Sequence, residues 1–496
     1  MERERSTCDA CSSLTTSIRN LRVCGQHGLI ALGAAKMNTE GRALLQALRR
    51  YNLFVASGAH ELAVDDSTTV LDKDGLPAAV FPSRELSDAE VTAVLAVSAF
   101  ARTGEPEHVI SERLFATQAG VRLHPVAGYY AGAYAGAVND DKDRARSSSG
   151  GLTTWFLQTL VRQGHVDGVI HMKASDDTTA LFSYAISRTS DEIAEGAKTR
   201  YFPGHVGPQL REIMNSNETF AIVGIPSILY EMRLAVRQFP NLGKRLKYFV
   251  GLICGHQKSA HYADALAWQV GIPPGELTDI DFRLKIPGQK ASAYGVAFHG
   301  RDAQGTPITA QRPASELYGT DWGLGFFKAN FSDHSDDVFN ETADIVFGDA
   351  WLPGYVDDSR GHNVVLTRAQ ELDEMLTRGA DAGEIKLDTL DVAQVVQSQG
   401  GLVRHGRELL PTRLKYFASR GEFVPPQRFE LGAPAGFARR RLQQLRVRMS
   451  RRSHHAYAAS VAAGDFSVFP QRMRWLTREY RLAYRAVRLI AKARQR

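Results

Sequence analysis

Cysteine is scarce in this chain of 496 residues, which contains only Cys8, Cys11, Cys24 and Cys254. Four cysteines in a chain of this length cannot form a disulfide framework. The charged N-terminus is also not followed by the apolar run that a secretory signal requires. We therefore expect a protein of the reducing cytoplasm.

Long apolar runs are missing as well. The longest, at residues 220–230 and 248–254, fall short of the roughly 20 residues that a helix needs to cross a bilayer. Their length and β-branched content favour buried strands instead. Because 44% of the residues are nevertheless apolar, the chain can bury a large core, which excludes disorder as its main state.

Acidic residues are nearly absent from the C-terminal segment. From Leu431 to Arg496 there are 15 Arg and one Lys against Asp465 and Glu479, a net charge of 16 − 2 = +14. Since the whole chain carries +6, the first 430 residues sum to 6 − 14 = −8. An acidic body followed by a strongly basic segment indicates that the two regions meet different surroundings.

Short apolar runs alternate with amphipathic stretches from about Ala127 onward, which is typical of a parallel sheet covered by helices. Strands are expected at residues 166–172, 220–226, 248–254, 345–347 and 364–367. Helices are expected at residues 152–163, 229–238 and 260–270. We predict an α/β fold with a mixed, largely parallel sheet flanked by helices, and a C-terminal helical extension.

Three local patterns refine this prediction. Residues 279–313 show shorter strands with polar breaks, which indicate an antiparallel insert of α+β character. Ser87 and Glu90 have the spacing of a capping box before a helix at residues 91–101. The glycines at 128, 132 and 136 favour a strand or loop that packs closely against another backbone.

A loop rich in serine and glycine precedes the helix expected at residues 152–163. It reads Arg144-Ala-Arg146-Ser147-Ser148-Ser149-Gly150-Gly151. Free N–H groups and the positive dipole end of a helix suit a phosphate, and two arginines strengthen this match. The pattern is neither a dinucleotide fingerprint nor a P-loop. A serine N-cap beside two solvated arginines would explain it equally well.

Two further groups contain metal-binding or reactive side chains. Cys8-x-x-Cys11 and Cys24-x-x-His27 resemble the spacing of a zinc or iron site, although unliganded thiols in a terminal segment are the alternative. Cys254, His256 and Lys258 follow a predicted buried strand, where parallel sheets bind ligands. There a functional site and simple packing of a buried cysteine are equally consistent with the sequence.

Taken together, these stretches resemble the beta-subunit family of coenzyme F-420 (deazaflavin) hydrogenases and dehydrogenases. The similar region runs from about Tyr129 to Arg368. It includes the Ser147–Gly151 loop, VDGVI at 166–170, Thr199-Arg200-Tyr201, Val223–Ser227, GLICGHQKS at 251–259, residues 281–285 and residues 343–353. So many motifs in the same order identify the chain as a member of this family.

The resemblance implies FAD as cofactor and electron transfer through iron–sulfur clusters to or from a deazaflavin or another acceptor. It implies catalytic roles for Cys254, His256 and Lys258. The cofactor-binding residues that we predict are Arg144, Arg146, Ser147, Ser148, Ser149, Gly150, Gly151, Arg200, Tyr201, Gly224, Pro226, Ser227, Asp349 and Trp351.

Each group of predicted site residues has an expected role. The Arg144–Gly151 segment would hold the FAD pyrophosphate, and Arg200 and Tyr201 would line the flavin. Lys258 or His256 would place positive charge near the ring edge that becomes anionic on reduction. Asp349 and Trp351 would close the other side.

The chain departs from the family pattern at the iron–sulfur ligands. Ser227 stands where the family has the cysteine of G-x-P-C, and Ser332 and Ser335 stand where it has C-x-x-C, so that only Cys254 remains. Cysteines expected after Cys24 are likewise replaced. Because a serine hydroxyl is a poor ligand where thiolate is required, we predict no iron–sulfur cluster and no metal in the body of the protein.

The loss of the cluster favours two-electron chemistry. The flavin would exchange hydride with a bound deazaflavin or another donor or acceptor, or meet a partner redox subunit at the surface. An alternative is a redox-inactive family member that serves as a binding or scaffold protein in a membrane-associated biosynthetic assembly.

On this basis we divide the chain into five segments. They are a degenerate ferredoxin-like N-terminal segment (1–45), a helical linker region (46–126), a flavin-binding α/β domain (127–290), the C-terminal part of the beta-subunit-like domain (291–430) and a basic helical tail (431–496).

The basic tail has helical periodicity. Its cationic stripe consists of Arg474, Arg478, Arg481, Arg485, Arg488 and Lys492. The opposite side of the helix is apolar and consists of Met473, Leu476, Tyr480, Ala483, Val487 and Ile490. A second apolar row, Trp475, Leu482 and Leu489, flanks the stripe. Such a helix suits an anionic membrane surface, at the inner face of the membrane for a cytoplasmic protein. The alternatives are a helix docked on the body with its arginines solvated and, ranked lower, nucleic-acid binding.

Overall fold

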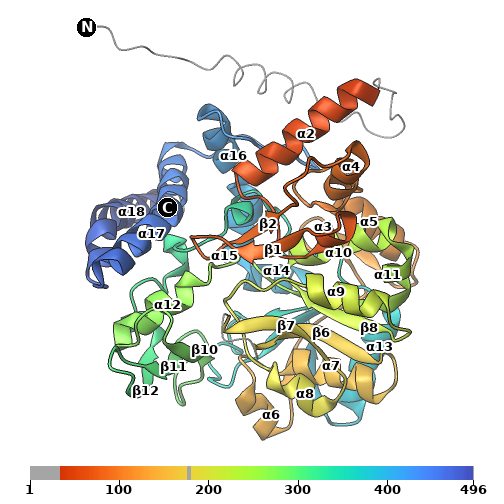
Figure 1. The fold of residues 1–496 in the computed structure, drawn as a ribbon. Helices are drawn as coiled ribbons and strands as arrows, with labels where there is room; N and C mark the ends of the chain where they lie inside the picture. The colour runs from red at the N-terminus through yellow and green to blue at the C-terminus, as the bar shows by residue number, and fades with distance from the viewer. Residues whose placement is uncertain (1–33, 176–179, 495–496) are drawn as a thin grey trace, which may run out of the picture.

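An eight-stranded mixed sheet forms the centre of the computed structural model, which describes residues 34–175 and 180–494 (Figure 1). Its strand order is β15-β5-β14-β13-β9-β8-β6-β7. The bounds are β5 Gly132–Val138, β6 Gly168–Ala174, β7 Phe182–Ser187, β8 Phe220–Gly224, β9 Leu246–Leu252, β13 Ile345–Asp349, β14 Asn363–Thr367 and β15 Ile385–Thr389. The four central strands are parallel and the outer ones antiparallel, which confirms the predicted α/β class.

The central strands are continuously apolar because helices cover both faces of the sheet. In β8, Phe220 and Ile222 point into one core, and Ala221 and Val223 point into the other. The first core includes α4 (Asp88–Val97) and α10 (Pro226–Gln238). The second includes α7 (Leu152–Arg162) and α13 (Gln370–Asp381).

The smaller N-terminal elements and two short helices from the middle of the chain lie against the first core. They are α2 Ala34–Arg50, α3 Ala59–Ala63, α5 Glu107–Phe115, α9 Gly207–Met214, α11 Pro240–Arg245 and the hairpins β1–β2 (Thr68–Leu71, Pro77–Val80) and β3–β4 (Arg122–His124, Gly128–Tyr130). The predicted capping box is confirmed, since the Ser87 hydroxyl accepts from the Glu90 N–H and the Glu90 carboxylate accepts from the Ser87 N–H.

The predicted antiparallel insert is a separate three-stranded sheet. It consists of β10 Leu277–Leu284, β11 Gly295–Arg301 and β12 Pro307–Pro313, all paired antiparallel. With α12 (His261–Ala267) it forms another apolar core, in which Phe282 and Phe298 are fully buried.

The sequence did not predict β15, which pairs with the glycine-rich strand β5. A Cβ added at Gly136 would lie 2.1 Å from the Lys386 carbonyl oxygen, so the expected close approach of two backbones is confirmed there, whereas Gly128 and Gly132 lie against side chains. Beyond β15 the chain is helical as expected. The elements there are α14 Val392–Ser398, α15 Gly400–Val403, a π-helical turn Arg404–Glu408 and α16 Leu410–Ser419.

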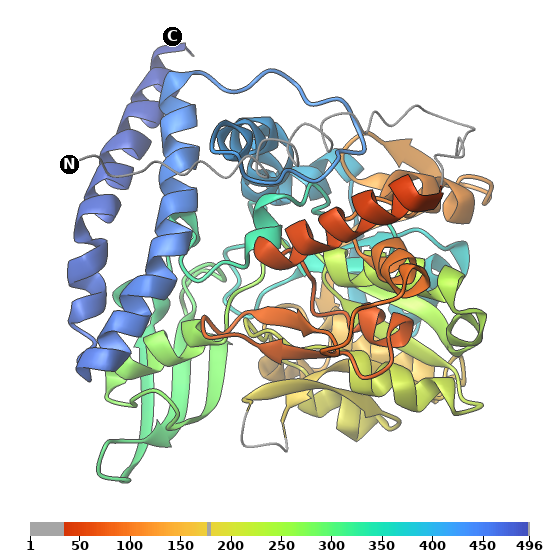
Figure 2. The same ribbon diagram turned by 45° about the horizontal axis from the view of Figure 1, so that its top comes forward.

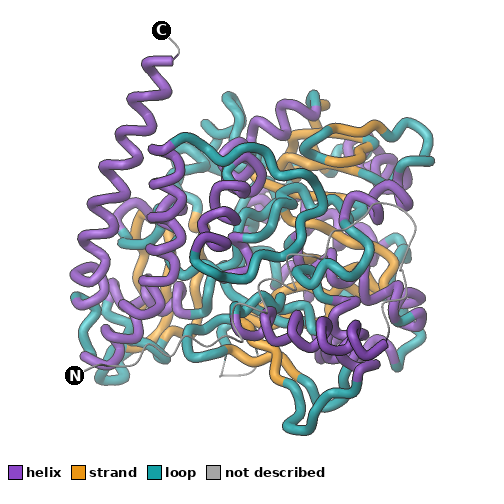
Figure 3. The backbone as a smooth tube through the Cα atoms, turned by 90° about the horizontal axis from the view of Figure 1, so that it is seen from above, coloured by secondary structure: helices purple, strands orange, loops and turns teal. Residues whose placement is uncertain are grey.

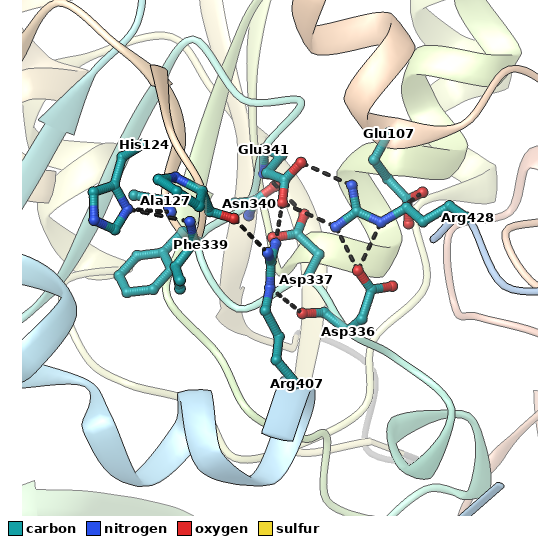
Figure 4. Close-up of polar contacts among 12 residues, drawn as sticks. Glu107, His124, Ala127, Asp336, Asp337, Phe339, Asn340, Glu341, Arg407 and Arg428 are labelled. Carbon is teal, nitrogen blue, oxygen red and sulfur yellow. Dashed lines mark hydrogen bonds and ion pairs between the residues drawn. The ribbon is translucent and has the colours of Figure 1, made fainter. Parts of the chain in front are cut away.

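Buried ion pairs fasten the segment after α15 to the body (Figure 4). Arg428 is 4% exposed and forms salt bridges with Asp336, with Glu341 (2.8 Å) and with Glu107 (3.7 Å). Arg407 also pairs with Glu341. Since several carboxylates share these two guanidinium groups, each charge in the network depends on the others.

The C-terminal segment forms a hairpin of two long antiparallel helices, α17 (Phe437–Ala463) and α18 (Val468–Arg494), along one side of the molecule (Figure 2). Met473 and Tyr480 of α18 are buried with Leu445 and Met449 of α17 in the core of the insert. The hairpin is therefore docked on the body through its inner face.

Strands from both segments predicted as separate domains, 127–290 and 291–430, share the central sheet. The division into five segments stays a prediction. Within the described residues, no helix combines the length and the apolar character needed to span a membrane.

Candidate cofactor-binding site

A cavity of about 650 Å³ lies at the carboxyl ends of the central strands. Gly224 of β8, Leu252 of β9 and Asp349 of β13 line it. This edge is where open α/β sheets bind ligands, and the volume lies within the usual range of about 300–1,000 Å³ for small-molecule sites. The lining is mainly apolar, as expected for a site that binds a planar ring.

The cavity brings together most of the predicted site residues. Those that line it are Ser147, Ser148, Ser149, Gly151, Arg200, Tyr201, Gly224, Cys254, His256, Lys258, Asp349 and Trp351. Arg144, Arg146, Gly150, Pro226 and Ser227 lie nearby without lining it. Lining residues that sequence reasoning missed include His171, Lys198, Arg283, Tyr294, Trp322 and Gln399.

The serine loop ends at the N-terminus of α7. Gly151 is the N-cap, has a left-handed backbone (φ 87°) and makes no side-chain cap hydrogen bond. The Leu152 N–H donates to the Asn363 side-chain oxygen (3.1 Å), whereas Thr153 and Thr154 follow it at the cavity wall. This arrangement leaves a helix N-terminus to stabilise a negatively charged ligand group.

The serine hydroxyls of this loop are bound within the protein. Ser147 donates to the Asp143 carbonyl oxygen (2.8 Å), and Ser149 donates to the His362 carbonyl oxygen (2.8 Å). Ser148 accepts from the Thr199 N–H (2.7 Å). The hydroxyls therefore shape the loop, and the donors it can offer to a ligand are backbone N–H groups and the Ser148 hydroxyl.

Arg144 is buried and faces away from the cavity. Its guanidinium donates to Asp358 (3.0 Å) and to the Gly361 carbonyl oxygen (2.8 Å). Arg146 is exposed. A lysine that the sequence did not single out as a site residue fastens the loop instead, because the Lys285 ammonium donates to the Ser149 carbonyl oxygen (2.8 Å). Burial lowers the pKa of Lys285 to about 7.

Arg200 is a cation at the cavity whose hydrogen-bonding capacity is not filled. Its guanidinium lies 4.4 Å from the centre of the Phe182 ring, and Nη1 donates weakly to the Ile280 carbonyl oxygen (3.4 Å). Its Nε is buried and has no partner among the described residues. A buried donor without an acceptor is costly, so Arg200 can gain from a ligand oxygen.

Aromatic rings surround the Lys258 ammonium on another side of the cavity. Its Nζ lies 4.7 Å from the ring centres of both Trp322 and Tyr262 and donates to the Phe326 carbonyl oxygen (2.6 Å). The Tyr201 ring is 4.7 Å from that of Trp322. Burial, followed by repulsion from Lys328, lowers the pKa of Lys258 to about 7. The lysine therefore changes charge near neutral pH.

Burial keeps the other two predicted catalytic groups neutral. It lowers the pKa of His256 well below its usual value, and the ring nitrogen Nε2 has no partner within the described chain. Burial raises the pKa of the Cys254 thiol to about 11, and its Sγ donates to the His256 carbonyl oxygen (3.5 Å). At neutral pH Cys254 is thus a thiol, which is a poor nucleophile and a poor metal ligand.

Asp349 and Trp351 form one wall of the cavity, and Arg283 contacts both of them. Arg283 makes a two-point salt bridge with the Asp349 carboxylate (2.8 and 3.3 Å) and lies over Trp351 (5.2 Å) and Tyr294 (4.7 Å). Gln399 also donates to the Asp349 carbonyl oxygen (2.7 Å). Asp349 therefore orients Arg283 and the rings beside it.

The serines at the former cysteine positions are part of the packed protein. Ser227 is buried in the first turn of α10, and the Ser332 hydroxyl accepts from the Gln257 N–H (3.1 Å). No cluster of three or more His, Cys, Asp or Glu side chains suited to a metal occurs in the described parts of the chain. Cys8, Cys11, Cys24 and His27 lie outside the described residues.

These residues fit FAD. The first turn of α7 at Thr153 and Thr154 and the unfilled Nε of Arg200 suit an anionic diphosphate. Tyr201, Trp322 and the apolar lining suit a planar ring, and the unpartnered His256 Nε2 suits a polar ring edge. The arrangement supports binding of an anionic cofactor that carries a ring system.

Two family models match the chain, and both describe the beta subunit of coenzyme F420 hydrogenase/dehydrogenase. The model of its N-terminal part matches residues 133–211, and the model of its C-terminal part matches residues 217–393. The chain is 25% identical over 113 residues to a subunit of the F(420)H(2) dehydrogenase of Methanosarcina mazei. That match covers 23% of this chain and 31% of the relative, so it spans about a third of the relative's length.

A solved structure of the F420-reducing [NiFe] hydrogenase complex from Methanosarcina barkeri contains a chain that is 16% identical. The superposition covers 62% of this chain and 99% of that one, with a TM-score of 0.45.

Proposed function

Because the chain belongs to the coenzyme F420 hydrogenase/dehydrogenase beta-subunit family, we propose that it is an FAD-dependent oxidoreductase whose cofactor binds in the cavity at the end of the central sheet. The observation that carries this proposal is the pairing of the α7 N-terminus, where Gly151 supplies no side-chain cap, with an aromatic wall in one cavity. The first suits a diphosphate and the second a flavin ring.

Three groups would hold the cofactor. The N–H groups of the first turn of α7, together with Arg200, would bind the diphosphate, and Lys285 would keep the loop in place through the Ser149 carbonyl oxygen. Tyr201 and Trp322 would contact the ring. Arg144 and Arg146 take no direct part in this arrangement, because one is bound to Asp358 and the other is exposed.

A bound flavin supplies the acceptance and donation of hydride. Lys258 contributes positive charge below about pH 7, where its ammonium is protonated, and this charge favours an anionic reduced ring. His256 stays neutral and can accept or donate one hydrogen bond through Nε2. The apolar lining would favour the ring of a bound flavin over water.

We propose that this protein transfers electrons in pairs, without an iron–sulfur relay in the body. The support is chemical: Ser227, Ser332 and Ser335 offer hydroxyls in place of thiolates, and the pKa of the remaining Cys254 thiol is raised. The reaction partner would be a deazaflavin or another hydride donor or acceptor. A partner redox subunit is also proposed, since the similar Methanosarcina mazei protein is named as one subunit of a dehydrogenase.

Absorption spectroscopy of the purified protein after incubation with FAD and gel filtration tests this function. We expect retained bands near about 370 and 450 nm, as for a bound oxidised flavin. Arg200→Gln should weaken FAD binding about tenfold, as expected for loss of a charged hydrogen bond. Arg301→Gln, an exposed residue of the insert, should leave binding unchanged.

A protein that stays colourless and takes up no FAD would overturn the proposal. That result would favour the alternative of a redox-inactive binding or scaffold protein. The bound Ser332 hydroxyl is compatible with this alternative, because a serine hydroxyl is a poor ligand for an iron–sulfur cluster.

A further inference from the structure

The outer face of α18 carries an apolar row that the fold does not use. Trp475, Leu482 and Leu489 are 67%, 57% and 68% exposed. Residues seven apart lie on nearly the same side of a helix. The three side chains therefore form one row about 21 Å long, at 1.5 Å of rise per residue.

Arginines border this row along its whole length. They are Arg474, Arg478, Arg481, Arg485 and Arg488, all exposed. Within the described chain none of them forms an ion pair, and the one acid of α18, Glu479, is paired with Arg441 of α17 (2.9 Å). Arg474 and Arg478 lie 5.7 and 5.9 Å from the Trp475 ring. The positive charge of this face is therefore not neutralised by the protein.

The opposite face of α18 already accounts for its docking on the body. Met473, Thr477 and Tyr480 are buried, and Tyr318 of the insert is 3.1 Å from the Thr477 hydroxyl. The sequence is consistent with two arrangements of this helix, one docked on the body and one bound to a membrane. The buried inner face docks the helix on the body, as in the first arrangement. The outer face remains free to contact a membrane.

More exposed apolar side chains lie at the open end of the hairpin. Phe437 at the start of α17 is 78% exposed, and Ile490 near the end of α18 is 45% exposed. Arg439 and Arg440 are exposed beside Phe437. The end of α18 stands clear of the body (Figure 3). A flat surface could approach it without meeting the rest of the molecule.

We propose that the outer face of α18 binds an anionic lipid bilayer, with the helix lying in the plane of the surface. Tryptophan and leucine would enter the boundary between headgroups and acyl chains, and the arginines would contact lipid phosphates. Binding to nucleic acid would use only the arginines, which contact phosphates, and would leave the exposed tryptophan and leucines without a role. The combination of one exposed apolar row with a parallel row of unpaired arginines along one side of it favours the bilayer.

Co-sedimentation with vesicles tests this proposal on the full-length protein. The probes are vesicles of phosphatidylcholine alone and of phosphatidylcholine with phosphatidylglycerol, at low salt. We expect the protein to sediment with the second kind only. Arg478→Gln, Arg481→Gln and Arg485→Gln together should lower the partition coefficient by roughly 100-fold, from about 1 kcal/mol per charge.

The apolar row is tested separately. Trp475→Ser, Leu482→Ser and Leu489→Ser together should lower the partition coefficient at least about tenfold while every arginine is kept. A matched control replaces three exposed apolar residues elsewhere, Val70, Leu71 and Leu123, by serine. A charge control replaces Arg122, Arg301 and Arg312 by glutamine. Both controls should sediment like the unmodified protein.

Three results would overturn the proposal. One is recovery of the full-length protein in the supernatant with both kinds of vesicle. Another is vesicle binding that survives loss of the apolar row, because simple charge attraction would then explain it. The third is tighter binding to a short DNA duplex than to anionic vesicles in a direct competition, which would assign the face to nucleic acid.

Discussion

Lys258 and Lys328 face each other across an antiparallel β-bridge, and their ammonium groups have different surroundings. Lys328 forms a salt bridge with Asp333. Lys258 instead meets two aromatic rings and the Phe326 carbonyl oxygen. The bridge thus places one lysine in a salt bridge and the other at the cavity.

The charge of Lys258 should set the potential of bound FAD. Because the pKa of Lys258 is lowered to about 7, its ammonium is charged at pH 6 and largely neutral at pH 8. Lys258→Met should lower the midpoint potential by about 30 mV near pH 6, which is ~1.4 kcal/mol for two electrons, and change it little near pH 8. Dye-equilibration titrations would measure both values. Equal potentials for the two proteins near pH 6 would contradict this role, and the exposed Lys290→Met serves as control.

Gly151 should be required for cofactor binding beyond its backbone conformation. In Gly151→Ala the backbone would have to keep φ 87°, which strains an alanine. The new Cβ would also lie 2.9 Å from Val138 Cγ2. We expect a loss of about 1–2 kcal/mol in the free energy of unfolding and at least about tenfold weaker FAD binding. Gly164→Ala is the matched control, with φ 68° and no atom within 4 Å. It should lose stability and keep FAD affinity; equal loss of affinity in both variants would refute the prediction.

The buried carboxyl of Glu231 should make the protein less stable as pH rises. Burial raises its pKa to about 8 in the folded protein, against an ordinary value of 4.5. Between these values the folded state holds a proton that the unfolded state has lost, so the free energy of unfolding falls with increasing pH. Glu231→Gln keeps an oxygen that can accept from the Ala99 N–H, and its amide nitrogen can donate to the Ser57 hydroxyl in place of a protonated carboxyl. Denaturant unfolding between about pH 5 and 9 should show a shallower decline for the variant. A parallel decline in both proteins would disprove the assignment.

Arg428 should be among the most destabilising positions to change. Arg428→Met leaves Asp336 and Glu341 buried with fewer cations, which typically costs about 3–5 kcal/mol in the free energy of unfolding. Arg420→Met is the comparison, because Arg420 is 53% exposed and its pair with Glu422 should contribute less than about 1 kcal/mol. Urea titrations give both values. Similar losses of the free energy of unfolding in the two variants would show that the buried network contributes no more to stability than the exposed ion pair.

The sequence predicts the central strands well because both faces of the sheet are buried. The continuous apolar runs of β8 and β9 follow directly from that burial. The sequence does not predict β15, because it is a short edge strand of mixed polarity, Ile-Lys-Leu-Asp-Thr. Its identity as a strand depends on pairing with β5, about 250 residues earlier. Such pairing leaves no local signal.

The sequence predicts many residues of the candidate site, but it does not predict which partners those residues contact. Motifs locate the Ser147–Gly151 loop, Tyr201 and Lys258 at one cavity. They do not show that Arg144 binds Asp358, which is 214 positions away in the sequence. Trp322 also has no local signal, because it lies in an irregular segment after the insert and reaches the cavity through tertiary packing alone.

The α17–α18 hairpin also contacts the segment that binds the Lys258 ammonium. The Phe327 N–H donates to the Ser453 hydroxyl of α17 (2.8 Å), and the Ser450 hydroxyl donates to the Lys328 carbonyl oxygen (3.3 Å). These bonds lie next to Phe326, whose carbonyl oxygen accepts from Lys258. A chain shortened at Glu430 would therefore lose a support of its cavity together with its basic face. Three consecutive residues, 326 to 328, thus join the hairpin to the Lys258 ammonium through hydrogen bonds.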